Sequence, residues 1–170
     1  MPPISRRHML GTAAALLAGG LAACGGSSDD ATPPRTTLLV YLLGSNLESM
    51  GNAGTGNLLE MLAAQGSAYT RVIITTGGAD KRDPGGLVSS WKTVKRFELA
   101  NGALKELADL GARDMDSSDT LQDFLIWGVR TYPAERTMLA LWDHGSGYYG
   151  YGGDENYPGE GKMMSLPAMS

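Results

Sequence analysis

Apolar and β-branched residues form three short, unbroken runs, each about as long as a β-strand. The runs cover residues 37–43, 71–76 (with Arg71 at its start) and 137–142, and the first two end directly at Gly44 and Gly77. An unbroken run of this kind, in place of strict alternation, is typical of a strand that is buried on both faces of a sheet. The hydropathy pattern therefore predicts three buried strands.

The segment between the first two runs predicts a loop followed by a helix. Residues 45–56 are polar and rich in glycine, so we expect a loop there. A helix is expected over residues 57–65, and Gly66 would end it. Its wide apolar face would consist of Leu58, Leu59, Met61 and Leu62.

A second helix and a further strand are expected before the third apolar run. The helix would begin at Asp119, with Gln122 reaching back to complete a capping box, and would stop at Tyr132-Pro133. Residues 91–99 mix apolar and charged positions and predict a more exposed strand at an edge of the sheet.

The alternation of strands and helices predicts the α/β class. In this class a largely parallel sheet is covered by helices on both faces, and ligands bind at the carboxyl ends of the strands. His144 follows the third run in the motif Trp142-Asp143-His144-Gly145, where such a fold holds a general base rigidly beside an open loop. Asp143 is not expected to orient His144, because adjacent residues on a strand point to opposite faces. Trp142, like Trp127, is expected to pack in the core.

The N-terminal segment has the pattern of an export signal. Arg6 and Arg7 precede an uncharged apolar run, residues 10–23, that is too short to span a bilayer. The arginine pair resembles a twin-arginine signal, and Leu21-Ala22-Ala23-Cys24 resembles a bacterial lipobox whose cysteine carries lipid. The alternative is an ordinary secretory signal that contains a cysteine. We therefore divide the chain into a signal (1–23), a flexible tether (24–35) and a domain (36–170).

Charge and cysteine content narrow the choice of function. The formal charge is −4, from 14 basic and 18 acidic residues; removing the signal takes away Arg6 and Arg7 and makes it −6. No basic stripe with interleaved aromatic residues is present, so nucleic acid is not an expected partner. Cys24 is the one cysteine, so the domain carries no disulfide.

Five sequence blocks, in this order and spacing, resemble the clostripain family of cysteine peptidases. They are residues 40–48, 114–116, 120–128, 132–134 and 141–145, with Asp154-Glu155 following the last. The family belongs to the caspase, legumain and gingipain superfamily. The resemblance implies a three-layer caspase-like sandwich with a mostly parallel sheet, of which this chain would be the N-terminal portion, incomplete at its C-terminus.

The resemblance also implies roles for individual residues. His144 matches the catalytic histidine, and Gly145 matches the glycine whose N–H helps to bind the oxyanion. Ser146, and Tyr148 with Tyr149, depart from the residues usual in the family. The family's nucleophilic cysteine would fall after position 170, so we expect this chain alone to be inactive. Ser146 has no nucleophile-elbow context and is no substitute.

Several smaller expectations remain open at this stage. Asp154 and Glu155 are weak candidates for binding calcium, with ordinary solvation as the alternative. Lys162, the one basic residue after His144, is a candidate site of self-processing. The tyrosine-rich loop 147–153 would either shape a substrate cleft or form a mobile surface.

Two functions follow. The first is a lipid-anchored endopeptidase of the bacterial cell envelope. The complete enzyme would cleave polypeptides after Arg or Lys. The alternative is a non-catalytic envelope lipoprotein that uses a peptidase-like domain for binding. A nucleotide-binding domain is disfavoured, because the glycine-rich segment 51–56 lacks the phosphate-loop lysine. The oligomeric state is left open.

Overall fold

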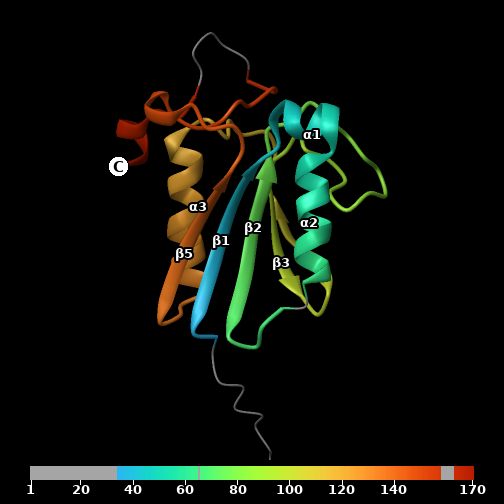
Figure 1. The fold of residues 1–170 in the computed structure, drawn as a ribbon, viewed down its shortest axis with the longest axis vertical. Coiled ribbons are helices and arrows are strands. Elements are labelled where there is room, and N and C mark those ends of the chain that lie inside the picture. The colour runs from blue at the N-terminus through green and yellow to red at the C-terminus, as the bar shows by residue number, and fades with distance from the viewer. Residues whose placement is uncertain (1–33, 65, 158–162) are drawn as a thin grey trace, which may run out of the picture. The chain divides into compact units, whose positions relative to one another are not determined.

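The fold centres on one five-stranded mixed sheet with helices on both faces (Figure 1). The computed structural model describes residues 34–64, 66–157 and 163–170. The strands lie in the order β4-β3-β2-β1-β5. The expected α/β class and layered sandwich are therefore confirmed.

Strand β1 (Thr36–Leu43) is the centre of the parallel part of the sheet. It pairs in parallel with β2 (Thr70–Gly77) on one side and with β5 (Arg136–Trp142) on the other. The carboxyl ends of these three strands therefore meet at one edge. Beyond β2 the sheet continues as an antiparallel hairpin of β3 (Lys95–Ala100) and β4 (Ala103–Asp109).

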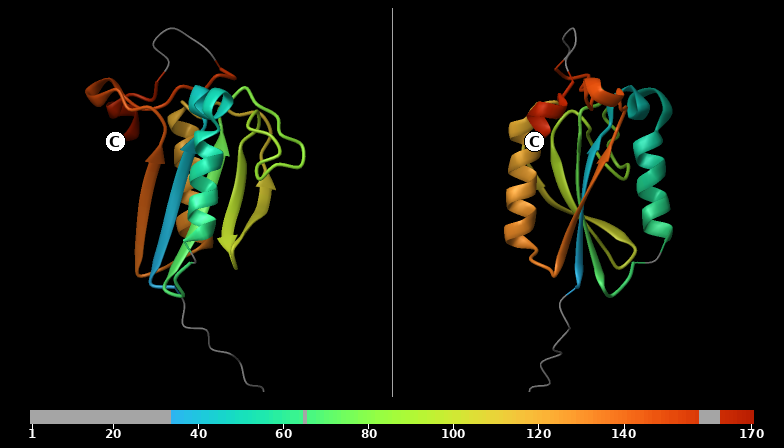
Figure 2. Two further views of the ribbon diagram at one scale, coloured as in Figure 1. Left: turned by 45° about the vertical axis from the view of Figure 1, so that its right-hand side comes forward. Right: turned by 60° about the vertical axis from the view of Figure 1, so that its left-hand side comes forward.

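The two faces of the sheet are covered by different helices. Helices α1 (Ser45–Gly51) and α2 (Ala53–Ala63) follow β1 directly, and α3 (Ser118–Thr131) precedes β5. The right-hand view of Figure 2 shows α2 and α3 on opposite sides of the sheet. Two short 3₁₀ turns, η1 (Gly147–Tyr149) and η2 (Leu166–Met169), follow β5. None of the described helices is long and apolar enough to cross a membrane.

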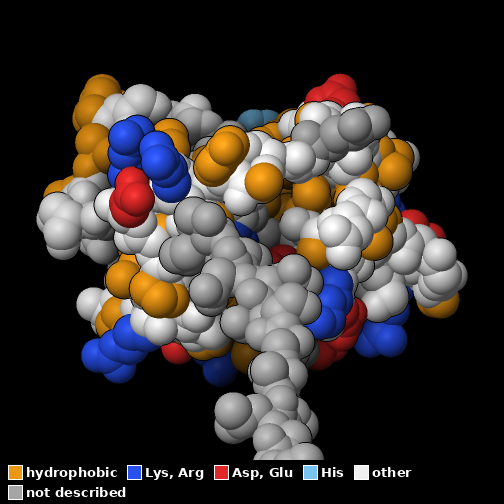
Figure 3. Space-filling view, turned by 90° about the horizontal axis from the view of Figure 1, so that it is seen from below, with side chains coloured by type: hydrophobic (Ala, Val, Ile, Leu, Met, Phe, Trp, Pro, Cys, Tyr) orange, Lys and Arg blue, Asp and Glu red, His pale blue; other side chains and the backbone are white. Residues whose placement is uncertain are grey.

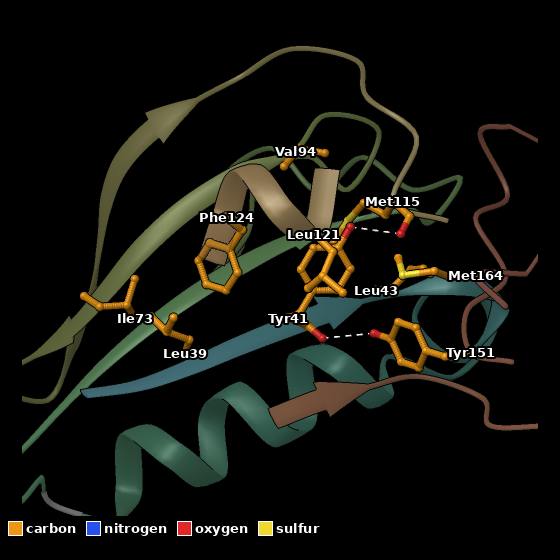
Figure 4. Close-up of a cluster of buried hydrophobic side chains, with 10 residues drawn as sticks. All are labelled: Leu39, Tyr41, Leu43, Ile73, Val94, Met115, Leu121, Phe124, Tyr151 and Met164. Carbon is orange, nitrogen blue, oxygen red and sulfur yellow. Dashed lines mark hydrogen bonds between the residues drawn. The ribbon is translucent and has the colours of Figure 1, made fainter. Parts of the chain in front are cut away.

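Alternate side chains of β1 pack in two separate hydrophobic clusters. Leu39, Tyr41 and Leu43 point toward α3, whereas Val40 and Leu42 point toward α2. Because consecutive side chains of a strand point to opposite faces, an unbroken apolar run fills both clusters at once. The α3-side cluster, drawn in Figure 4, consists of Leu39, Tyr41, Leu43, Ile73, Val94, Met115, Leu121, Phe124, Tyr151 and Met164.

The end of the domain at which the parallel strands begin shows no gathering of one residue type among the described residues. Figure 3 views the end at which the parallel strands begin. Where described residues form the surface seen in this view, apolar, basic and acidic side chains are mixed. The distinctive arrangements lie instead at the carboxyl edge of the sheet.

The strand expected over residues 91–99 is partly wrong. Residues 91–94 belong to the loop before β3, and Trp91 is fully buried against the α2 side. Strand β3 lies inside the sheet, because β4, which the hydropathy pattern did not reveal, covers its outer side. Both basic residues of β3 are buried and ion-paired: Lys95 pairs with Glu106 and Asp109, and Arg96 with Asp123.

Two helix expectations also require correction. The segment 45–56 is helical and not a loop, because Asn52, in the left-handed conformation at φ 53°, joins α1 to α2 with only a one-residue break. The α3 cap is Ser117, whose hydroxyl accepts the Asp119 N–H at 3.3 Å, so Asp119 lies inside the helix. Leu59 was placed on the apolar face of α2 but is 54% exposed.

Strand β5 was expected to be buried, but it is an edge strand in the described structure. It pairs on one side only, and Met138, Leu139 and Leu141 are each at least 40% exposed. Trp142 and Trp127 are half-buried; each packs at the border of a cluster, and the indole N–H of Trp142 donates to Asn57 at 2.7 Å.

The contact between α3 and β1 leads to a stability prediction. A Cβ added at Gly128 would lie 2.7 Å from Leu39 Cδ2, whereas one added at Gly56 in α2 would have no atom within 4 Å. We expect Gly128→Ala to destabilise the protein by about 1–3 kcal/mol despite its higher helix propensity. Urea unfolding measures this. The matched Gly56→Ala variant should instead be stabilised by about 0.5–1 kcal/mol; equal effects would contradict the packing argument.

Candidate active site

His144 and Asn46 form the centre of the site at the carboxyl edge of the sheet. His144 lies two residues after β5 and is exposed; Asn46 lies in the first turn of α1, three residues after β1. The Nε2 atom of the His144 ring is 2.7 Å from Oδ1 of Asn46. Because an amide oxygen accepts, the neutral ring carries its proton on Nε2 and keeps the lone pair on Nδ1.

A second pair lies directly beside the first. Ser45 donates its hydroxyl to Oδ1 of Asp143 at 2.5 Å. Burial raises the pKa of the Asp143 carboxyl, and the Ser45 hydroxyl opposes that shift. As the sequence led us to expect, Asp143 does not bind the His144 ring.

Gly145 leaves the space beside His144 open. A Cβ built at this glycine would meet no atom within 4 Å. The free space is compatible with a substrate carbonyl approaching the Gly145 N–H, the role implied by the resemblance.

The loop that carries His144 is closed by backbone pairing and displays two tyrosines. Gly145 forms a bridge with Tyr151, and the Ser146 N–H donates to the Gly150 carbonyl at 3.0 Å. Between them, Tyr148 and Tyr149 are 72% and 68% exposed, with ring centroids 4.0 Å apart. Residues 147–149 are therefore exposed, whereas residues 150–152 are buried. Both roles considered for this loop, a wall of a substrate cleft and a mobile surface loop, stay predictions.

Two buried tyrosines anchor this loop to the core. The Tyr151 hydroxyl lies 3.0 Å from the carbonyl oxygens of both Tyr41 and Trp142, and the Tyr41 hydroxyl donates to the Met115 carbonyl at 2.9 Å (Figure 4). Burial raises the pKa of both phenols. They are therefore neutral donors that satisfy carbonyl groups at the strand ends.

Asp116 and Asp154 form a reciprocal clasp between the segment before α3 and the loop after β5. The Asp116 carboxylate accepts the N–H groups of Gly153 and Asp154 at 2.9 and 2.8 Å. In return, the Asp154 carboxylate accepts the N–H groups of Met115 and Asn156, both at 2.8 Å. Each aspartate thus satisfies the backbone of the other's segment.

The clasp holds its carboxyl groups in an unfavourable environment for charge. Burial raises the pKa of Asp116 to about 6, and the negative charges of Asp154 and Asp114 add to that shift. The N–H donors of the clasp act in the opposite direction but do not compensate fully. Burial also raises the pKa of Asp154.

The residues considered for calcium are engaged within the protein. Asp154 belongs to the clasp, and Glu155 accepts from the Ser49 hydroxyl at 3.0 Å and the Asp80 N–H at 2.8 Å. Among the described residues no group of three or more histidine, cysteine or acidic side chains could hold a metal ion. These oxygens do not form a vacant ligand set, and simple solvation, the alternative, does not describe them either.

Four residues singled out from the sequence lie outside the described residues. They are Arg6, Arg7, Cys24 and Lys162. Because Cys24 is the chain's one cysteine, no thiol accompanies His144 in the described structure.

Comparison with known proteins gives a likeness of fold. No protein-family model matches the chain, and no curated protein matches it. Solved structures do match. A clostripain from Bacteroides thetaiotaomicron, in complex with a peptide inhibitor, is 22% identical with a TM-score of 0.51, over 68% of this chain and 95% of that chain. A secreted C11 cysteine protease from the same organism, with an irreversible peptide inhibitor, is 17% identical with a TM-score of 0.60, over 80% of this chain and 38% of that chain.

This chain has the fold of clostripain-like cysteine proteases. A cysteine protease from B. fragilis agrees, with 13% identity and a TM-score of 0.50 over 66% of this chain. The caspase-like sandwich implied by the sequence resemblance is therefore confirmed as a fold. At these identities the likeness assigns no residue a role.

Sequence reasoning missed three residues of this site. Asn46, Ser45 and Asp116 all lie in blocks that carried the family resemblance, but none had been given a role. A signal for the first two was present: both directly follow the first buried run, and parallel strands bring their carboxyl ends together. Asp116 gave no comparable signal, because its partners lie 37 and 38 residues away.

The raised pKa of Asp116 predicts how stability depends on pH. The pKa of about 6 in the folded state exceeds the ordinary aspartate value of 3.8, so the folded state binds the proton more tightly than the unfolded state. The resulting stabilisation is fully present below about pH 4 and is lost as the pH rises through about 6. We expect Asp116 to contribute about 1 kcal/mol more to the free energy of unfolding at pH 5 than at pH 7.

Urea unfolding at the two pH values measures this contribution as the difference between the wild type and Asp116→Asn. The Asp116→Asn variant should lose that part of the pH dependence. The exposed Glu135→Gln variant, which also removes one carboxyl group, should retain it. An Asp116→Asn protein with the wild-type pH profile would show that this carboxyl does not titrate as stated.

Proposed function

We propose that this chain is the histidine-bearing part of an exported, lipid-anchored, clostripain-like cysteine endopeptidase. The observation that carries the proposal is the His144–Asn46 pair, held at the carboxyl edge between two parallel strands on a fold shared with cysteine proteases. This edge is where an α/β fold places its reactive groups.

The pair suits the proton transfers of peptide hydrolysis. Asn46 holds the proton on Nε2, so Nδ1 of His144 is free to take the proton of a thiol and to return it to the leaving amine. The attacking thiolate would form a tetrahedral intermediate, whose oxyanion would be stabilised by N–H donors that include Gly145. The proposed substrate is a polypeptide cleaved after Arg or Lys.

The nucleophile would come from polypeptide beyond this chain. The exposed apolar residues of β5 support this proposal, because Leu139 and Leu141 face the α3 side of the sheet while Met138 faces the α2 side. A strand that is apolar on both faces suits an interior position. A further strand that carries the cysteine would cover it and bring the thiol toward His144.

The remaining parts of the proposal come from the sequence. Arg6 and Arg7 would direct export, the lipid on Cys24 would hold the protein at a membrane of the bacterial envelope, and cleavage after Lys162 would process the enzyme. Calcium dependence stays a prediction from the resemblance, and Asp154 and Glu155 offer it no support.

Hydrolysis of peptidyl-Arg and peptidyl-Lys amides tests the catalytic proposal. The 170-residue chain should be inactive. The reading frame should be followed past Ser170 and the longer chain expressed if it encodes a strand ending in Asp-x-Cys. We expect that chain to be active and His144→Ala to lower kcat/KM by about 100-fold or more.

The exposed Glu135→Gln variant is the control and should keep wild-type activity. Activity of the 170-residue chain that His144→Ala abolishes would contradict the need for an external thiol. A coding region with no such strand would favour a non-catalytic lipoprotein.

Metabolic labelling with an alkyne fatty acid tests the anchor. Wild-type protein should incorporate the label and sediment with membranes, whereas Cys24→Ser should do neither, because the lipid thioether requires that sulfur. A labelled Cys24→Ser protein would show that the lipid is attached elsewhere. Release of both proteins into the soluble fraction would favour an ordinary secretory signal.

A further inference from the structure

We propose that Ser45 and Asp143 act as a positioning pair that sets the distance and angle between Asn46 and the His144 ring. The inference rests on the proposed function only in giving His144 a role in hydrolysis. The hydrogen bonds described below, and the experiment that tests them, concern the position of the His144 imidazole and not peptide hydrolysis.

The two pairs form a ladder of two consecutive rungs. Ser45 bonds to Asp143 and Asn46 bonds to His144, so each rung joins residues 98 positions apart. Within the sheet, β1 and β5 are paired with an offset of 100, as in Thr36 opposite Arg136. The chain after β1 must therefore take two extra residues to reach its partner beyond β5.

The backbone at Ser45 supplies this change of offset. Its φ is +45°, in the left-handed region that non-glycine residues seldom occupy, and such a strained conformation persists only where the surroundings impose it. The side chain compensates locally. Its hydroxyl donates to Asp143 at 2.5 Å, and the same oxygen accepts the Leu47 N–H at 3.3 Å. This turn directs the following residue, Asn46, toward His144.

Ser45 is not itself a nucleophile, although a strained serine between a strand and a helix resembles a nucleophile elbow. The residue is only 1% exposed, and its hydroxyl proton is directed at Asp143. The His144 ring is bonded to Asn46 and not to Ser45. The arrangement therefore supports two separate pairs and not a catalytic triad.

Asp143 is held in an unusual way for a merely structural carboxylate. Its Oδ2 is buried without a hydrogen-bond partner, while Oδ1 receives the short bond from Ser45. A buried carboxylate oxygen without a partner is costly, so the Ser45 bond is the main favourable side-chain contact that retains Asp143 here. Removing either member should weaken the attachment to α1 of the segment that carries His144, although the Ser49–Glu155 bond further along the loop remains.

The test compares the accessibility and tautomer of the His144 ring in variants of the 170-residue chain. Diethyl pyrocarbonate modifies an imidazole nitrogen that carries a lone pair, so a ring released from Asn46, which can present either nitrogen, should react faster than one held as the Nε2–H tautomer. Mass spectrometry gives the rate at His144 relative to added N-acetylhistidine. The ¹⁵N shifts of the ring report whether the proton stays on Nε2. Asn46→Ala, which removes the acceptor directly, calibrates both measurements.

We expect Ser45→Ala and Asp143→Ala to raise the modification rate about fivefold, the factor for losing one ordinary hydrogen bond, and to mix the tautomers. Asp143→Asn keeps an acceptor for the Ser45 hydroxyl and should restore most of the wild-type behaviour. The exposed Ser146→Ala variant, two residues after His144, should match the wild type. Ser45→Gly relieves the left-handed strain, so it should fold even if Ser45→Ala does not, and should still raise the rate.

Wild-type rates and tautomers in the Ser45 and Asp143 variants, with a changed Asn46→Ala protein, would overturn the proposal. An unchanged Asn46→Ala protein would overturn it as well, because the contact being positioned would not exist in solution. Neither result depends on peptide hydrolysis, so the endopeptidase proposal can fail while this one holds.

Discussion

The parallel pairing of β1 with β5 is the constraint on which the site depends. It brings the ends of two strands, separated by about a hundred residues of chain, to the same edge. The two side-chain pairs at the site then follow from what comes after each strand: Ser45 and Asn46 after β1, and Asp143 and His144 after β5. The unbroken apolar run of β1 makes the pairing possible, since it fills the clusters on both faces of the sheet. Side chains that would fill only one face would leave β1 unable to support helices on both sides.

A network of buried polar groups gives the loop after β5 its shape. Tyr151 bonds to carbonyl groups at the strand ends, and Asp116 and Asp154 exchange backbone donors across two segments. Each group satisfies a buried N–H or C=O that would otherwise be unpaired, which explains why polar residues occupy so much of the interior near the site. The cost is the desolvation of three carboxyl groups at this edge: burial, and to a smaller extent the negative charge of neighbouring aspartates, raises the pKa values of Asp116, Asp143 and Asp154.

The sequence predicted the parts of the fold that depend on hydrophobic periodicity. All three apolar runs are strands, and His144 lies at the expected strand end. The helical segment 45–56 was missed because its glycines and polar residues give a loop pattern, while Glu48, buried and bonded to Thr55, holds the junction of α1 and α2 in the folded state. The partners of His144 and Asp143 could not be derived, because the offset of the two rungs depends on one left-handed residue. Local pattern indicates that a strand ends, but not how the chain turns afterwards.

The segment after position 162 is held to the domain by more than its covalent connection. Tyr151 and Met164 exchange two backbone hydrogen bonds, at 3.0 and 2.8 Å, and the Met164 side chain is almost fully buried in the α3-side cluster. A Cβ at Gly150 would collide with the Met164 carbonyl, so the two backbones are in direct contact. In a protein cut after Lys162, these contacts would thus hold the residues around Met164 in place without the covalent connection. Processing would change the connectivity of the polypeptide while leaving the interior around Tyr151 intact.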